Sequence, residues 1–171
     1  MGGADALRGQ RDVAQVTGVA VAPAICAGFL LAVLWMDLIF DTQVLAYRRA
    51  GSELPEPVLA SIAGYYHRAT MRPMSALIAA VMAVLVIAVA IRVASGHAPW
   101  WLIAAAGLLA GGPIVLALTR TVPHAVRLGR REDTVAVQSR LARSILVDHL
   151  ACFGLMVAFL SVWVTAISLG C

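Results

Sequence analysis

Long apolar runs separated by short polar connections dominate the chain. An apolar helix of about 20 residues crosses the roughly 30 Å hydrocarbon layer of a bilayer at 1.5 Å per residue. Four runs reach that length, at about residues 18–40, 74–94, 99–118 and 145–169. The pattern predicts an all-α fold, an integral membrane four-helix bundle with up-down-up-down topology, formed by a single transmembrane domain over residues 1–171.

Composition supports lipid as the surrounding solvent. Hydrophobic residues make up 61% and charged residues 13% of the chain, whereas soluble domains carry about 25% charged residues. A water-soluble core of this size could not enclose so much apolar surface, because small folds leave much of their area exposed. The first run follows a start of mixed charge and is too long for the apolar core of a signal peptide, so we expect it to be retained.

The arginines indicate an orientation. All 13 basic residues are arginine. With four spans, three lie on the side of the termini, namely Arg8, Arg11 and Arg92. The other ten share the opposite side: Arg48, Arg49, Arg68, Arg72, Arg120, Arg127, Arg130, Arg131, Arg140 and Arg143. The positive-inside rule then places the first and third connections in the cytoplasm and both termini outside the cytoplasmic membrane. We expect these arginines to meet membrane lipids and not nucleic acid, because no aromatic-interleaved basic module accompanies them.

The first connection carries a predicted helix of its own. Pro55 suits a helix start, and the residues after it place an apolar stripe on one face: Val58, Ile62 and either Tyr65 or Tyr66. This short helix either lies on the membrane surface or is an early extension of the second span, with Pro73 kinking the junction. We assign the two tyrosines to the interfacial aromatic belt, while a place in a site stays open. The second half of the third connection is expected to be helical and to lead into the fourth span.

Acids and histidines near the spans converge on one side of the predicted bundle. Alternating helix directions bring six of them to the arginine-rich side: Asp37, Asp41, His67, His124, Asp148 and His149. His97 falls on the opposite side. Asp37 and Asp148 each lie one turn inside a span, where an acid usually faces the bundle interior. Asp37 and Asp41 also share a helix face, since they are four residues apart. We therefore expect these side chains to meet partners from neighbouring helices.

Two kinds of chemistry fit such a cluster. Carboxylates and imidazoles at facing helix ends can bind a transition metal ion, with the candidate ligands Asp37, Asp41, His67, Asp148 and His149. Aspartate and histidine can also share general acid and base roles near neutral pH, with the candidate catalytic residues His67, Asp148 and His149. The chain lacks the Glu-x-x-His spacing of di-iron bundles, the attachment motif of c-type haem and the glycine motifs of nucleotide sites. The cofactor stays unknown, and a transition metal ion is one candidate.

Three further stretches follow one another in a characteristic order. The chain runs from "YYHRATMRPMSALIAAVMAVLVIA" through "LTRTVPHAVR" to "SRLARSILVDHLACFGLMVAFLSVW". Over residues 32–164 this layout resembles the anthrone-oxygenase-like family of small four-helix membrane proteins. The chain has Thr121 and Ala125 around Pro123, where that family usually has asparagines. It has Asp148 and His149, with arginines before them, in place of the family's usual His and Arg run. The resemblance implies oxidation of a lipophilic polycyclic phenol or quinol-like substrate without an organic cofactor.

Three functions follow from these observations. Small-residue-rich spans such as "LIAAAGLLAGG" favour close helix association, which is typical of a helical subunit or assembly factor of a larger membrane complex, or of a homo-oligomer. Sequence alone favours this role. The second is the oxidoreductase implied by the resemblance, which binds a lipophilic small molecule. The third is metal or proton handling, with polar groups lining a pathway: Asp37, Asp41, His67 and Asp148.

Overall fold

Helices make up the regular secondary structure of the described chain. The computed structural model describes residues 2–47, 53–96 and 99–169, with side chains from Val21 onward in those ranges. Arg48, Arg49 and His97 lie outside the described residues. In chain order the elements are α1 (Gly2–Asp41), the 3-10 helix η1 (Thr42–Tyr47), α2 (Glu56–Ala69), α3 (Met74–Ala94), α4 (Trp100–Leu116), the π-helix η2 (Ala117–Thr121), α5 (Val122–Arg130) and α6 (Val135–Ser168).

Four helical segments are long and apolar enough to cross a membrane. They are Val21–Tyr47, Met74–Ala94, Trp100–Arg130 and Val135–Ser168. The predicted all-α membrane bundle is thereby confirmed. The third and fourth segments extend beyond the predicted spans because the connection between them is itself mostly helical. Pro123 lies in the first turn of α5, where its missing N–H breaks no bond within that helix.

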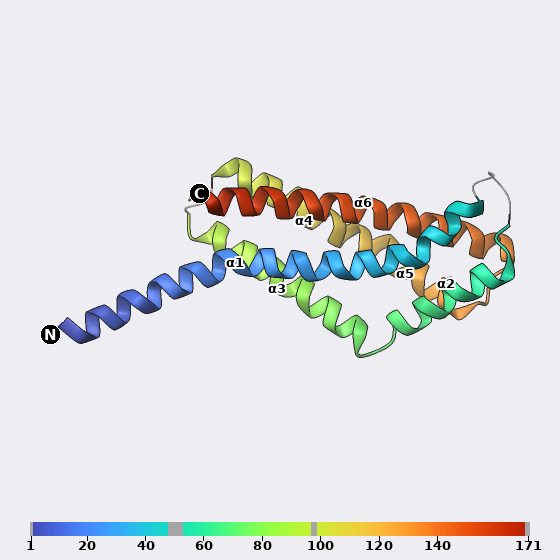
Figure 1. Ribbon diagram of the computed structural model, residues 1–171, viewed down its shortest axis with the longest axis horizontal. Helices are drawn as coiled ribbons and strands as arrows, with labels where there is room; N and C mark the ends of the chain where they lie inside the picture. The colour runs from blue at the N-terminus through green and yellow to red at the C-terminus, as the bar shows by residue number, and fades with distance from the viewer. Residues whose placement is uncertain (1, 48–52, 97–98, 170–171) are drawn as a thin grey trace.

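The helices alternate in direction, so that connections gather at two ends. Figure 1 shows both termini at one end and α2, α5 and the start of α6 at the other. α1 packs along α6 and α3, and α4 packs along α6. α3 starts away from α1 and approaches it along its length (Figure 1). Elements far apart in sequence therefore meet at the end that carries α2 and α5.

An apolar core fills the middle of the bundle. Leu85 of α3 and Met156 and Phe159 of α6 are buried there together with small side chains of α1 and α4. The rings of Phe159 and Trp163 stack with their centroids 5.6 Å apart. Large apolar side chains on the outer faces of the same helices are exposed. This exposure is expected where lipid covers the surface.

The helix of the first connection packs against protein at the end of the bundle. α2 buries Leu59, Ile62 and Tyr66 against α5 and α6. It ends at Ala69, and a turn separates it from α3. α2 is therefore separate from α3 and is not a continuous extension of it, while its position on the membrane surface stays a prediction. Its outer face is exposed, as expected for a helix at the membrane boundary.

α5 closes this end of the bundle against α2. A Cβ atom at Gly129 would lie 3.0 Å from the backbone nitrogen of His67, so only glycine permits this approach without a shift of the backbone. The backbone N–H of Leu54 donates to Ser139 Oγ at 2.9 Å, which ties the first connection to α6. Both contacts hold α2 close to the end of α1 and the start of α6.

Candidate functional site

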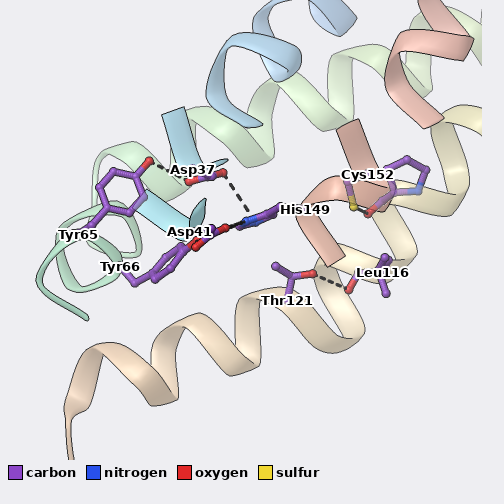
Figure 2. Close-up of polar contacts among 9 residues, drawn as sticks. Asp37, Asp41, Tyr65, Tyr66, Leu116, Thr121, His149 and Cys152 are labelled. Carbon is purple, nitrogen blue, oxygen red and sulfur yellow. Dashed lines mark hydrogen bonds and ion pairs between the residues drawn. The ribbon is translucent and has the colours of Figure 1, made fainter. Parts of the chain in front are cut away.

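Five polar side chains from three helices meet at the end of α1. Asp37 and Asp41 lie one turn apart on α1, His149 lies on α6, and Tyr65 and Tyr66 lie on α2 (Figure 2). Asp41 is fully buried at 0% exposure, and Tyr66, His149 and Asp37 are exposed by 3%, 7% and 9%. Buried polar groups are tolerated when they satisfy one another, and here each of the five has a partner within the cluster.

Asp41 holds the imidazole of His149. Asp41 Oδ2 lies 2.7 Å from His149 Nδ1, and the hydroxyl of Tyr66 donates to Asp41 Oδ1 at 2.7 Å. The same hydroxyl lies 3.3 Å from Nδ1. Since an ionised carboxylate only accepts hydrogen bonds, these partners place a proton on Nδ1 and direct Nε2 to the other side of the ring. The result is an oriented Asp–His pair.

Asp37 faces the opposite edge of the imidazole. Its Oδ2 lies 3.7 Å from His149 Nε2, and its Oδ1 accepts a hydrogen bond from the hydroxyl of Tyr65 at 2.8 Å. The ring of Tyr65 stacks on Phe40 with centroids 4.1 Å apart. The gap at Nε2 exceeds hydrogen-bond distance, which leaves this nitrogen able to accept a proton from a ligand.

Both tyrosines lie outside the four candidate spans and are held as neutral phenols. Burial and the nearby carboxylates of Asp37 and Asp41 raise the pKa of Tyr65 well above its ordinary value. The same causes raise the pKa of Tyr66 further. Each therefore acts as a hydrogen-bond donor to its aspartate across the ordinary pH range.

A largely apolar cavity of about 310 Å³ adjoins the cluster. Asp37, Tyr66 and His149 lie on its wall, whereas Asp41 lies behind them. The rest of the wall is mainly apolar and comes from all four candidate spans, with examples in Leu30, Ile78, Met82, Ile114 and Met156. A cavity of this volume is at the lower end of the range for small-molecule sites, which are typically apolar with a few placed polar groups.

The other hydroxyls on the cavity wall are already engaged by the backbone. Thr70 donates to the carbonyl of Tyr66 at 2.7 Å, and Ser75 donates to that of Met71 at 3.4 Å. Thr121 donates to the carbonyl of Leu116 at 3.4 Å. A ligand in the cavity therefore meets one concentrated polar patch, formed by the carboxylate, imidazole and phenol.

The π-helix η2 shapes one wall of the cavity. Such widened turns free carbonyls from the regular pattern and are frequent at functional sites. Figure 2 shows the hydroxyl of Thr121 reaching the carbonyl of Leu116. The thiol of Cys152 donates to the carbonyl of Pro113 at 3.8 Å. Pro113, Thr121 and Cys152 also line the cavity, so these contacts hold its wall in place.

The predicted site residues separate into two groups. Asp37, Asp41 and His149 come together as one buried cluster. His67 is exposed on the outer face of α2. Asp148 is buried but faces away, with its Oδ2 3.2 Å from Arg120 Nε. Consecutive residues on a helix point about 100° apart, which explains why Asp148 and His149 meet different neighbours.

For Tyr65 and Tyr66 the sequence favours the interfacial belt and leaves a place in a site open. In the structure Tyr66 is buried and both phenols bind the aspartates, which makes them members of the cluster. The signal available in the sequence was the stripe that places Tyr66 four residues after Ile62. It predicted a buried face for α2 without saying what would cover it.

Most donor atoms of the cluster are engaged with one another. Among the described residues, no group of three or more His, Cys, Asp or Glu side chains is arranged to hold a metal ion. Both oxygens of Asp41 and the Nδ1 atom of His149 already bind one another or Tyr66. The metal-binding and catalytic roles assigned to Asp37, Asp41, His67, Asp148 and His149 stay predictions.

Comparison with known proteins does not assign a family. No family model matches the chain, and neither curated proteins nor solved structures gave a match. The chain is an integral membrane protein with four long apolar helices and a buried cluster formed by Asp37, Asp41 and His149.

Proposed function

We propose that this membrane protein is an oxidoreductase that acts on a flat lipophilic phenol or quinol-type substrate. The observation that carries the proposal is the apolar cavity of about 310 Å³ with His149, Asp37 and Tyr66 on its wall. Such a site favours a ligand with one hydroxyl group on an otherwise apolar body. The resemblance to the anthrone-oxygenase-like family points to the same class of substrate.

His149 is the base in this proposal. The substrate hydroxyl donates to Nε2, and the imidazolium that forms is stabilised by Asp41 at 2.7 Å and by Asp37 at 3.7 Å. A positioned base of this kind typically accelerates proton transfer by about 10²–10⁴-fold. Asp37 lies beside the imidazole and accepts a hydrogen bond from the half-buried Tyr65, and it offers the proton a way out of the cluster.

The oxidant is dioxygen, and the reaction balances without an organic cofactor. The enol form of an anthrone loses its hydroxyl proton to His149, and the electron-rich anion then reacts with dioxygen. One oxygen atom becomes the new carbonyl of the product. The two hydrogens of the former methylene leave as water with the second oxygen atom.

Entry from lipid agrees with the position of the cavity. Leu118 and Val122 line it and are 63% and 48% exposed, so the cavity reaches the lipid-facing surface near η2. A lipophilic substrate dissolved in the bilayer can therefore approach without crossing water. The polar patch would then capture its hydroxyl group.

Oxygen uptake by the purified protein in lipid vesicles, with an anthrone or hydroquinone added, tests this function. We expect His149→Ala to lower kcat by about 100-fold or more, with a smaller change in KM because the apolar walls remain. His124→Ala is the matched control, since His124 lies on α5 outside the cavity wall. Undiminished turnover in His149→Ala, with the protein folded, would rule the proposal out.

A helical subunit of a larger complex is the second candidate. The residues buried along α3 within the described chain are Leu85 and Ala88. An exposed stripe of small residues runs along the same helix at Ala76, Ala80 and Ala83. Small residues at this spacing let a second membrane helix approach closely. Fixed partner subunits retained in mild detergent would favour this function.

A further inference from the structure

The cavity beside the Asp–His cluster, which is formed by Asp37, Asp41 and His149, changes character along its length. His149 is the first residue of α6 on the cavity wall, and Asp37 is the last residue of α1. Because the two helices run in opposite directions (Figure 1), both residues lie at the end of the cavity nearest α2. The wall residues farthest from them on α6 and α1 are apolar, namely Met156 and Leu30.

The apolar end lies about one and a half to two helical turns from the cluster. Met156 follows His149 by seven residues, and Leu30 precedes Asp37 by the same number. At 1.5 Å per residue, this spacing corresponds to about 10 Å along either helix. The two helices agree, so Leu30 and Met156 lie at one level. The cavity is therefore elongated along the helix axes, with the polar patch at one end.

The apolar core of the bundle closes the far end. Leu30 and Met156 are buried in this core, and the half-buried Met82 of α3 packs against it. About one turn farther on, Leu85 of α3 and Phe159 of α6 are fully buried. Leu30, Met82 and Met156 also line the cavity, so these three side chains form its floor.

We propose that this floor selects ligands by length, and that the site takes phenols with an apolar group opposite the hydroxyl. The inference rests on the proposed function, because it takes His149 and Asp37 as the place where the hydroxyl binds. With the hydroxyl there, a group attached opposite to it points along the cavity toward Met156. A chain that reaches the floor gains apolar burial, whereas a longer chain meets closely packed side chains.

Binding of 4-alkylphenols in the absence of oxygen tests the proposal. Calorimetry on the purified protein in lipid nanodiscs, with empty nanodiscs as the blank, gives Kd for chains from ethyl to octyl. We expect Kd to fall about fourfold for each added methylene until the chain meets the floor, and not to fall beyond that length. The 2-alkyl isomers are equally apolar, but their chain points across the cavity. They should bind about tenfold more weakly, as for the lost burial of two methylenes.

Substitutions in the floor should move this length limit. Met156→Ala opens space beneath the cavity, so the octyl compound should bind about tenfold more tightly than it does to the wild type. Met82→Ala at its half-buried position should move the limit in the same direction and disturbs the core less. Met74→Ala is the matched control, because Met74 is exposed and lies outside the cavity wall. Thermal unfolding shows that each variant is folded.

The possible results separate this proposal from the proposed reaction. A Kd that keeps falling through octyl in the wild type would overturn the length limit. Equal Kd values for the 2-alkyl and 4-alkyl isomers, or an unchanged limit in both floor variants, would overturn it as well. Length-limited binding without oxygen uptake would retain the floor and exclude the oxidoreductase. Oxygen uptake with binding that does not depend on chain length would do the opposite.

Discussion

Asp37 and Asp41 share one helix face but have different roles around His149. Asp41 is fully buried, and both of its oxygens are occupied by Tyr66 and His149. It can orient the imidazole but has no free oxygen for a ligand. Asp37 lines the cavity, and its Oδ2 faces Nε2 across 3.7 Å. Of the two acids, Asp37 is therefore the one that a ligand can contact.

The phenols of Tyr65 and Tyr66 give a pH dependence that can be measured. Their pKa values are raised by burial and by the nearby carboxylates. A raised folded-state pKa adds stability that is fully present below the unfolded tyrosine pKa of about 10 and is lost as the pH rises through the folded value. We expect phenolate absorbance near pH 10 to be the same in the wild type and in a variant with Tyr65→Phe and Tyr66→Phe.

Unfolding followed over the same alkaline range provides the second measurement. The free energy of unfolding should fall more steeply above pH 10 in the wild type than in the double variant. The reason is that the unfolded wild type gains two phenolates that the folded protein resists. If the wild type shows extra phenolate absorbance near pH 10 while still folded, the contacts with Asp37 and Asp41 are not maintained.

The contacts of single residues were predictable where their depth in a span and their spacing along the helix restricted the possible partners. Asp37 lies too far inside an apolar span to lack a partner, and Asp41 follows it on the same face, so the sequence predicted a meeting with other helices. It did not choose between His67, His124 and His149. That choice depends on the rotation of each helix about its axis, which packing decides. The rotation of α6 about its axis likewise explains why Asp148 pairs with Arg120.

The contact between α2 and α5 decides the shape of the end that carries the site. Both helices are amphipathic, and their buried faces meet each other and the start of α6. The sequence predicted a helix for the second half of the third connection only. In the structure its first half forms α5, where Arg127 and Arg130 are exposed while Ala125 and Leu128 are buried. The apolar stripe of α2 could therefore be predicted, but its partner could not.

Gly129 provides a test of this helix contact. A Cβ atom there would lie 3.0 Å from His67 N and 3.2 Å from His67 Cα, and backbone atoms cannot easily move aside. We expect Gly129→Ala to destabilise the protein by about 1–3 kcal/mol, as overpacking does in tight contacts. Thermal or denaturant unfolding in detergent measures this change.

Gly107→Ala is the matched control for Gly129→Ala. Gly107 lies in α4, and a Cβ atom there would meet nothing within 4 Å. This change should stabilise the helix by about 0.5–1 kcal/mol, because glycine is less favourable than alanine in a helix interior. Equal effects of the two substitutions would show that α2 and α5 do not approach closely at Gly129.

The bundle as a whole follows from lipid as the solvent. Apolar runs of sufficient length leave few arrangements other than membrane helices, so the fold class was predictable from hydropathy and length. The cavity was not. It depends on the widened turn of η2 and on α3 approaching α1 at an angle (Figure 1). Neither has a sequence signal as strong as a run of twenty apolar residues.

The distribution of arginines predicts how the whole molecule is oriented across the membrane. The end with α2, α5 and the start of α6 carries eight described arginines: Arg68, Arg72, Arg120, Arg127, Arg130, Arg131, Arg140 and Arg143. The opposite end carries Arg92 near the end of α3, together with Arg8 and Arg11 before the first span. We therefore predict that the end with α2 and α5 faces the cytoplasm, together with the Asp–His cluster.

Cysteine labelling in intact cells can decide this orientation. In a background with Cys171→Ser, Ser95→Cys reports on the end of the termini and Thr134→Cys on the end with α2 and α5. Both positions are exposed, whereas Cys26 and Cys152 are buried. A membrane-impermeant maleimide should label Ser95→Cys in intact cells, but Thr134→Cys only after permeabilisation. The reverse pattern would invert the orientation and keep the bundle. Labelling of both positions from the same side would contradict the fourfold crossing, because the candidate span Trp100–Arg130 separates Ser95 from Thr134.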